Sequence, residues 1–316
     1  MLLELERIES ATGIHVPVMV EEVLEALAVI PGGRYVDCTV GTGGHAEAIL
    51  EAASPGGLLL GLDVDADALE VAARRLERFG PDVRLVKANY RDLMAVCRSY
   101  NFVPVHGVLF DLGLSSFQLA HPQRGFSFQM EGPLDMRFNQ TQDLRAHDLV
   151  NKLPEKELAD IIWRYGEERQ ARRIARAIVR ARPIHTTVEL AEVVARAVGR
   201  ASGRIHPATR TFQALRIAVN QELENLEVAL YQAVQVLGKG GRLVVISYHS
   251  LEDRVVKRFL WQEARDCICP PGSPVCQCGH RATLRVVSRG PMRPSPQEVE
   301  RNPRARSARM RVAERL

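Results

Sequence analysis

Residues 35–50 read YVDCTVGTGGHAEAIL. A short apolar run ends at Asp37, three glycines follow (Gly41, Gly43 and Gly44), and the next residues have a helical pattern. A strand, a glycine turn and a helix bring backbone N–H groups and the positive end of a helix dipole to one point. The stretch therefore predicts a parallel α/β fold in which something comes very close to the backbone at this turn.

Apolar runs and helical patterns alternate over the first 115 residues, which predicts a parallel sheet with helices on both faces. From about residue 117 to 211 only helical patterns and polar loops follow. A helix over about 213–236, a strand in GGRLVVISYH and a helix over 251–264 then resume the first pattern. We expect a doubly wound sheet domain (1–116 and 212–316) interrupted by an all-helical insertion (117–211). The runs expected as strands cover 35–40, 58–63, 83–87 and 105–111, with helices near 44–53, 66–79 and 91–99.

The bulk composition indicates a cytosolic protein. No segment approaches the 18 apolar residues of a membrane span, and the N-terminus lacks the pattern of a signal peptide. The net charge is +4, but ten arginines against three acids follow from Arg281 to the end, which favours an anionic partner such as nucleic acid. In this tail, ARMRVAE fits a last strand that closes the sheet and turns its arginines to RNA, with simple disorder as the alternative.

The glycine turn narrows the choice of ligand. His45 and Ala46 follow Gly44, where a phosphate-gripping loop has Lys and Ser or Thr, so a nucleoside triphosphate is disfavoured. Asp63, twenty residues after Gly43 at a strand end, is placed to accept hydrogen bonds from both ribose hydroxyls. Two adenosine cofactors remain, a nicotinamide dinucleotide and S-adenosylmethionine. The acids Asp37 and Asp111 at the same sheet edge favour the sulfonium cation over a pyrophosphate.

Several long motifs in order carry a family resemblance: HVPVMVEEVLEAL, GTGGHA, DLGLSSFQL, RGFSF, PLDMR, HPATRTFQALRIAVNQEL, SYHSLEDRVVK and NPRARSARMR. Over residues 14–313 the chain resembles the MraW (RsmH) family, the ribosomal RNA small subunit methyltransferase H enzymes. The resemblance implies a class I methyltransferase. It implies methyl transfer from S-adenosylmethionine to the N4 amino group of a cytidine in the decoding region of small-subunit (16S) ribosomal RNA, with the RNA or the 30S particle as substrate.

The resemblance also implies cofactor contacts, carried over position by position. Tyr90 stands where the family often has Phe, and its ring suits adenine equally well. The implied cofactor residues are Gly43, Gly44, His45, Asp63, Tyr90, Asp111 and Gln118.

Methylation of N4 needs a hydrogen-bond acceptor for the amino protons, because the nitrogen lone pair is delocalised into the ring. The Asp/Asn-Pro-Pro-aromatic motif of many amino-methyltransferases is absent after the fourth strand. Asp111 and Ser115 are the candidate catalytic residues, with Ser116 as an alternative and turn capping as the competing role of both serines. Phe126 or Phe128 is a candidate for stacking on a flipped base, and His249 for contact with RNA or the amine.

A strip of arginines in EERQARRIARAIVRARP predicts the RNA contact. On a helix these side chains share one face, Ile174 and Ile178 lie opposite, and no acid falls within the strip. The competing interpretation is a solvated charged face. The strip comprises Arg169, Arg172, Arg173, Arg176 and Arg180, and Arg204, His206, Arg210 and Arg216 are expected to extend it.

The six cysteines divide into two groups. Cys38 and Cys97 adjoin apolar runs and are expected in the core. Four others crowd into CICPPGSPVCQCGH, with His280 as another possible ligand. Four thiolates suit a tetrahedral zinc site, but C-x-C spacing is unusual, so a zinc site and a loop without metal are equally favoured and redox-labile thiols are a third alternative. No metal is assigned to the catalytic site. Two rival functions stay open, a nicotinamide-dependent oxidoreductase and a ribosome-assembly binding protein with a vestigial cofactor site. Homodimer formation is also open.

Overall fold

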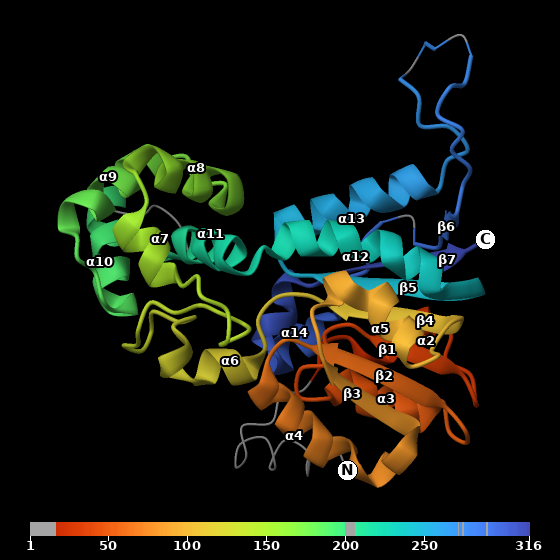
Figure 1. The fold of residues 1–316 in the computed structure, drawn as a ribbon. Helices are drawn as coiled ribbons and strands as arrows, with labels where there is room; N and C mark the ends of the chain where they lie inside the picture. The colour runs from red at the N-terminus through yellow and green to blue at the C-terminus, as the bar shows by residue number, and fades with distance from the viewer. Residues whose placement is uncertain (1–16, 200–205, 271, 274, 289) are drawn as a thin grey trace. The chain divides into compact units, whose positions relative to one another are not determined.

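The computed structural model describes residues 17–199, 206–270, 272–273, 275–288 and 290–316. These residues form two compact units, drawn in Figure 1. The sheet unit comprises the residues up to Gly113 and those from Leu223 onward, and the helical unit comprises Leu114–Glu222. The expected boundaries were residues 116 and 211, so the structure assigns one more helix to the helical unit.

The sheet has seven strands in the order β3-β2-β1-β4-β5-β7-β6. The first five pair in parallel, with registers such as Tyr35 opposite Leu59 and Leu109 opposite Val244. β7 lies antiparallel between β5 and β6. The predicted strands, including the one in the tail, are therefore confirmed. Their bounds are β1 Arg34–Asp37, β2 Leu58–Asp63, β3 Val83–Lys87, β4 Val105–Asp111, β5 Leu237–Ser247, β6 Leu284–Val286 and β7 Arg309–Arg315.

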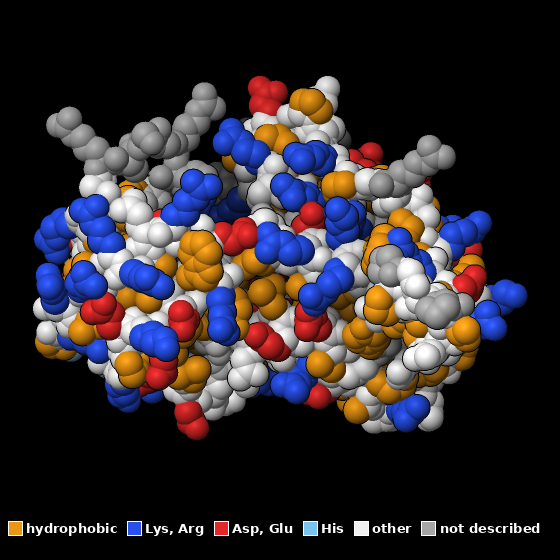
Figure 2. Space-filling view, turned by 90° about the horizontal axis from the view of Figure 1, so that it is seen from above, with side chains coloured by type: hydrophobic (Ala, Val, Ile, Leu, Met, Phe, Trp, Pro, Cys, Tyr) orange, Lys and Arg blue, Asp and Glu red, His pale blue; other side chains and the backbone are white. Residues whose placement is uncertain are grey.

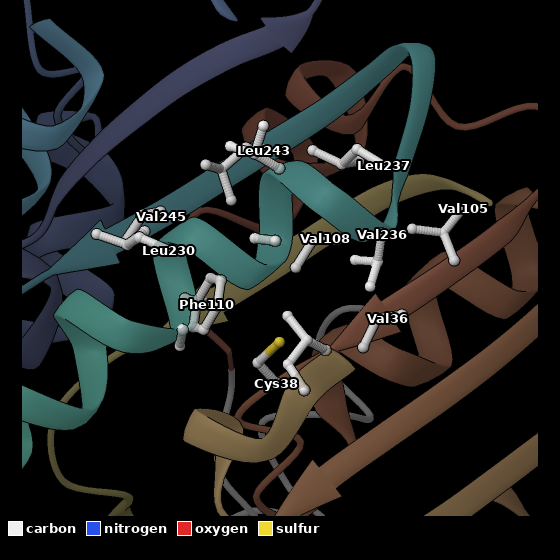
Figure 3. Close-up of a cluster of buried hydrophobic side chains, with 14 of the residues drawn as sticks. Val36, Cys38, Val105, Val108, Phe110, Leu230, Val236, Leu237, Leu243 and Val245 are labelled. Atoms are coloured by element: carbon white, nitrogen blue, oxygen red, sulfur yellow. The ribbon is translucent and has the colours of Figure 1, made fainter. Parts of the chain in front are cut away.

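Successive residues of each strand alternate between two apolar cores, because side chains alternate across a pleated sheet. On β4, Val108 and Phe110 join one core and Leu109 joins the other. The first core, shown in Figure 3, packs against α5 (Leu93–Ser99), α12 (Glu222–Val236) and α13 (Ser250–Glu263). The second packs against α2 (Val20–Leu27), α3 (Gly44–Ala52) and α4 (Ala66–Leu76). Helices thus cover both faces, and the expected core residues Cys38 and Cys97 are buried.

The helical unit has a core of its own, to which α7 to α11 each contribute apolar residues. Its connecting loop is held from inside by Arg124, whose Nη2 donates to the carbonyls of Arg137 (3.2 Å) and Phe138 (3.0 Å). Asn220 donates to the Met136 carbonyl (2.7 Å). The RGFSF and PLDMR motifs therefore serve the framework of this unit. The helices are α6 Ser116–Ala120, α7 Ala146–Lys152, α8 Glu155–Gly166, α9 Ala171–Ala181, α10 Thr187–Val198 and α11 Thr209–Asn220.

The single helix predicted over 213–236 is wrong. The chain forms α11 and α12 instead, because Gln221 adopts a left-handed conformation (φ 50°) and its N–H bonds back to the Ile217 carbonyl, which ends α11. The region after α13 also contains β6 and the short helix α14 (Pro296–Arg301), which the sequence pattern did not predict. No helix of the described ranges is long and apolar enough to cross a membrane.

The arginines of β7 were expected to face RNA, and the structure corrects this. Arg311 Nε lies 2.7 Å from Asp253 Oδ1, and Arg309 Nη1 lies 3.2 Å from Asp253 Oδ2. Arg315 donates to the Thr283 carbonyl (2.7 Å). β7 lies inside the sheet, so its basic side chains meet carboxylates and carbonyls of the adjoining helix and strand.

Candidate cofactor and active site

Side chains at the carboxyl ends of three parallel strands hold the turn after β1. Asp37 Oδ1 accepts the backbone N–H of Thr39 (3.0 Å), and Thr39 Oγ1 accepts the backbone N–H of Asp111 (2.7 Å). Asp63 Oδ2 accepts the backbone N–H of Gly41 (2.9 Å). The turn therefore ties together the ends of β1, β2 and β4, the edge where ligands bind in open α/β sheets.

The glycines of the turn have two separate physical roles. Gly43 has φ 87°, a left-handed conformation that favours glycine, and caps α3 with no side-chain hydrogen bond. A Cβ on Gly44 would lie 2.9 Å from Cγ of Pro17, and one on Gly43 would lie 3.3 Å from Cδ1 of Leu76. The sequence predicted that something comes close to the backbone at this turn. On the side where a Cβ would lie, that neighbour is the protein's own Pro17 and Leu76.

Asp63 ends β2 and keeps both carboxylate oxygens engaged with backbone N–H groups. Oδ2 accepts from Gly41 and Oδ1 accepts from Asp65, each at 2.9 Å. A carboxylate oxygen offers two lone pairs, so each retains acceptor capacity beyond these bonds. Asp63 thus positions the glycine turn and is also able to accept hydrogen bonds from a ligand.

Asp111, the last residue of β4, lies between a tyrosine and a histidine. The Tyr248 hydroxyl donates to Asp111 Oδ1 (2.8 Å), and His45 Nδ1 lies 3.5 Å from Asp111 Oδ2. His45 Nε2 donates to the Val18 carbonyl (2.9 Å), because a carbonyl oxygen only accepts. This bond fixes the proton on Nε2 and turns the unprotonated Nδ1 of a neutral His45 toward the carboxyl group.

Burial dominates the electrostatics of the three strand-end acids. It raises the pKa of Asp37 and of Asp111 to about 7, and that of Asp63 to about 6. The Tyr248 hydrogen bond holds the pKa of Asp111 down against this effect. Burial also lowers the pKa of His45. An arrangement of this kind favours a cationic ligand, which would restore the ionised carboxylates, over an anionic one.

The other predicted site residues lie in different places. Tyr90 opens a short 3₁₀ turn after β3, and its ring meets Phe110 of β4 edge-on, with the centroids 5.9 Å apart. Gln118 and Ser115 belong to the helical unit, where they form a reciprocal cap on α6. The Gln118 N–H donates to Ser115 Oγ (3.1 Å) and the Ser115 N–H donates to Gln118 Oε1 (3.2 Å). The sheet unit thus brings together the turn, Asp63 and Asp111.

Three further candidates have structural contacts. Phe126 is buried and stacks on Phe138 with centroids 5.4 Å apart, so it is not presented to a base. Phe128 is half-buried between Phe212 and His206. His249 is the N-cap of α13, where its Nδ1 accepts the Glu252 N–H. The side chain of Ser116 lies outside the described residues.

The predicted arginine strip is largely present. Ile174 and Ile178 are buried, and all five arginines are exposed, although Arg169 precedes α9. The expectation of a strip without acids is wrong at Arg176, whose Nε lies 3.3 Å from Glu155 Oε1 of α8. On the face drawn in Figure 2, Lys and Arg side chains are likewise spread among acidic ones.

The proposed extension of the strip is only partly supported. The Arg216 side chain is only 11% exposed and makes two hydrogen bonds of 2.8 Å with Glu222, so it does not extend the surface. Arg210 is exposed and lies 3.6 Å from Glu168. His206 is exposed beside Phe128, and Arg204 falls outside the described residues.

Sequence reasoning did not find Tyr248 or the contacts that anchor His45. Tyr248 follows β5 within SYHSLEDR, and only pairing of β4 with β5 brings its hydroxyl to Asp111. Met19, next to the His45 partner Val18, donates its N–H to Glu298 of α14 (2.7 Å). Since 279 positions separate these two residues, no local pattern signals the contact.

The strand order, the antiparallel β7 and the strand-end acids around a glycine turn define a class I methyltransferase. The chain belongs to the MraW methylase family, which it matches over residues 12–316. Three proteins called ribosomal RNA small subunit methyltransferase H are among its relatives. The protein from Dehalococcoides mccartyi is 60% identical over 302 residues, covering 96% of this chain and 86% of the relative. That from Thermomicrobium roseum is 56% identical (96% and 94% covered), and that from Syntrophobacter fumaroxidans is 52% identical (95% and 96% covered).

Family membership confirms the predicted class of enzyme, an S-adenosylmethionine-dependent methyltransferase. It also decides between the two adenosine cofactors considered for the glycine turn, against the nicotinamide-dependent oxidoreductase.

Proposed function

We propose that this enzyme transfers a methyl group from S-adenosylmethionine to N4 of a cytidine in the decoding region of 16S ribosomal RNA. The relatives' name, ribosomal RNA small subunit methyltransferase H, supports the RNA substrate. The single observation that carries the chemistry is the cluster of Asp111, Tyr248 and His45 at the carboxyl edge of the sheet.

The cofactor fits the residues of the turn by charge and hydrogen bonding. Each carboxylate oxygen of Asp63 accepts one backbone N–H and has a second lone pair, with which it accepts a hydrogen bond from a ribose hydroxyl. The N-terminus of α3, which has no side-chain cap, takes the methionine carboxylate at Gly44 and His45. Tyr90 supplies a ring for the adenine. Gln118 is retained as a cofactor contact on the resemblance alone.

The sulfonium charge explains why buried acids gather where the cofactor binds. Asp37 and Asp111 have pKa values near 7 without a ligand, so at neutral pH each is only partly ionised. A cation nearby lowers both values and gains their attraction in a poorly screened site. A pyrophosphate at the same place would meet repulsion from the same groups.

Methyl transfer also requires an acceptor for the amino protons of cytosine. An acceptor builds electron density on N4 as the nitrogen attacks the methyl carbon in line with the leaving sulfur. Asp111 is the better of the two candidate acceptors, because a carboxylate accepts hydrogen bonds more strongly than a hydroxyl, and one lone pair of Ser115 Oγ is engaged in the α6 cap. Tyr248 positions the Asp111 carboxylate, and its hydrogen bond lowers the pKa of Asp111, which favours the ionised form.

Arg169, two residues before α9, and the exposed arginines of α9 supply the contact with the RNA backbone. Within the described ranges, Arg169, Arg172, Arg173 and Arg180 have no carboxylate partner. Guanidinium groups on one helix face suit a row of phosphates. This surface positions the RNA, and base recognition is left to the sheet edge.

Labelled methyl transfer followed by nucleoside analysis tests the proposal. The enzyme is incubated with methyl-labelled S-adenosylmethionine and unmodified small-subunit RNA or 30S particles, and the RNA is digested to nucleosides. We expect label in N4-methylcytidine, and a large loss of transfer in Asp63→Asn but not in the exposed control Asp67→Asn. Label at another atom or only in large-subunit RNA contradicts the substrate assignment. If the cofactor binds but no methyl group is transferred, the result supports the rival function, a ribosome-assembly binding protein with a vestigial cofactor site.

A further inference from the structure

The cysteine-rich loop between α13 and β6 extends away from the sheet in Figure 1, and none of its described residues belongs to an apolar core. The described residues over 265–279 are all exposed except Cys269, which is half-buried, and Val275 is 67% exposed. Its four cysteines nevertheless converge. The Sγ atoms of Cys267, Cys269, Cys276 and Cys278 all lie within 4.8 Å of one another.

The spacing of the sulfur atoms is that of ligands around one tetrahedral ion. Cys276 Sγ lies 3.6 Å from Cys278 Sγ, and Cys278 Sγ lies 3.8 Å from Cys267 Sγ. A zinc–sulfur bond of about 2.3 Å gives a tetrahedron edge of about 3.8 Å. A disulfide needs about 2.05 Å, so these pairs are not disulfide bonds. The C-x-C spacing is no obstacle, because the two sulfur atoms within each Cys-x-Cys arm lie within 4.8 Å of each other.

Backbone N–H groups also point at the sulfur atoms. The Ile268 N–H donates to Cys278 Sγ and the Gln277 N–H to Cys269 Sγ, each at 3.4 Å. Each bond crosses from one Cys-x-Cys arm to the other. N–H donors favour the thiolate, the form that binds metals.

We propose that Cys267, Cys269, Cys276 and Cys278 bind one Zn²⁺ as a structural Cys₄ site. Each thiol gives up its proton on binding, and four thiolates close the tetrahedron, so no position is left for substrate or water. His280 is not needed as a ligand, since its Nε2 donates to the Gln262 carbonyl (3.1 Å) and anchors the loop to α13. The ion replaces the missing core of the loop and takes no part in methyl transfer.

Metal analysis of the purified full chain is the first test. We expect one zinc per chain, retained through dialysis without chelator. Cys276→Ser and Cys267→Ser lose most of it, while Ser273→Ala, a matched change in the same loop, keeps it. The bound zinc is then removed with a chelator under reducing conditions. In a titration with ZnCl₂ against a chromogenic chelator, we expect the wild type to bind one equivalent of zinc again and the two cysteine variants to bind none. Iron in place of zinc, or a reduced protein that takes up no zinc, overturns the assignment.

Thiol reactivity separates metal loss from misfolding. In the native protein we expect the four loop thiols to react slowly with a thiol reagent. After the zinc is removed by a chelator they should react rapidly, while the buried Cys38 and Cys97 should continue to react slowly. Far-ultraviolet circular dichroism and S-adenosylmethionine binding stay unchanged in Cys276→Ser, but the loop becomes more sensitive to protease. Four fast thiols before chelation contradict the proposal, as does protease sensitivity that zinc removal does not change.

Discussion

Replacing Tyr248 by Phe tests the role given to Asp111, because it removes a single hydroxyl. That hydroxyl donates to Asp111 Oδ1 at 2.8 Å. Burial raises the pKa of Asp111 to about 7, and this hydrogen bond opposes the increase. Without the hydroxyl, the ionised carboxylate is less stable and its pKa rises.

The size of the effect follows from the difference between two hydrogen bonds. A hydrogen bond to a charged group contributes about 1.5–3 kcal/mol, and one to a neutral group about 0.5–1.5 kcal/mol. The difference of about 1.4 kcal/mol corresponds to about one pKa unit. A rise from about 7 to about 8 reduces the ionised fraction at pH 7.5 from about three quarters to about one quarter. We therefore expect about a threefold loss of rate at pH 7.5 and almost none at pH 9.

The assay is the rate of methyl transfer at saturating cofactor from pH 5.5 to 9.5. The wild-type rate should rise through an apparent pKa near 7, and the Tyr248→Phe curve should lie about one unit higher. Tyr35→Phe is the matched control, because the Tyr35 hydroxyl is buried in the same unit and accepts the backbone N–H of Ile30 (2.8 Å). A Tyr248→Phe curve reduced equally at every pH, or superimposed on the wild type, refutes the assigned role of Asp111.

Gly43→Ala should lower the free energy of unfolding by about 2 kcal/mol, and Gly240→Ala by about 1 kcal/mol. Both glycines have positive φ, but a Cβ would contact neighbouring atoms only at Gly43. Equal losses of unfolding free energy for the two variants in thermal unfolding would contradict close packing at Gly43. Asp253→Asn should cost about 2 kcal/mol at pH 7, less than a fully buried pair. The arginine partners of Asp253 outweigh the effect of burial, so its pKa lies below the usual value. The stability advantage of the wild type over Asp253→Asn in urea unfolding should therefore shrink as pH falls. A difference in unfolding free energy between the two proteins that does not change with pH contradicts this role of Asp253. Replacing three arginines by Ala should reduce the slope of log affinity against log salt by about 2, and an unchanged slope contradicts RNA contact. The three are Arg172, Arg173 and Arg180.

Periodicity in the sequence predicted much of the sheet unit. Apolar runs identified five parallel strands, and the run in ARMRVAE identified β7. Spacing also predicted the buried face of α9 at Ile174 and Ile178. These features depend on residues close together in the chain, so a local pattern is sufficient to find them.

Features that depend on one backbone angle or on distant partners were not predictable. The break at Gln221 comes from a left-handed conformation that glutamine rarely adopts, and nothing in its composition signals it. The ion pairs of Arg216 with Glu222 and of Arg311 with Asp253 turned expected RNA contacts into internal ones. Charge in the sequence does not reveal which partner an arginine meets.

The candidate site was predicted in part for the same reason. Acids at strand ends meet at one edge of any parallel sheet, so Asp63 and Asp111 followed from the strand pattern. The tyrosine that holds Asp111 and the tautomer of His45 required the paired strands and the Val18 carbonyl.

The most direct test of the central claim compares two ligands that differ by one methyl group and one positive charge. Calorimetric affinities for S-adenosylmethionine and for neutral S-adenosylhomocysteine are measured with the full chain between pH 5.5 and 8.5. Since the pKa values of Asp37, Asp63 and Asp111 lie near 6 to 7, protonation removes their negative charge at the lower end. The account predicts that acidification weakens binding of the sulfonium cofactor several-fold more than that of its neutral counterpart. Parallel affinity curves for the two ligands would contradict it.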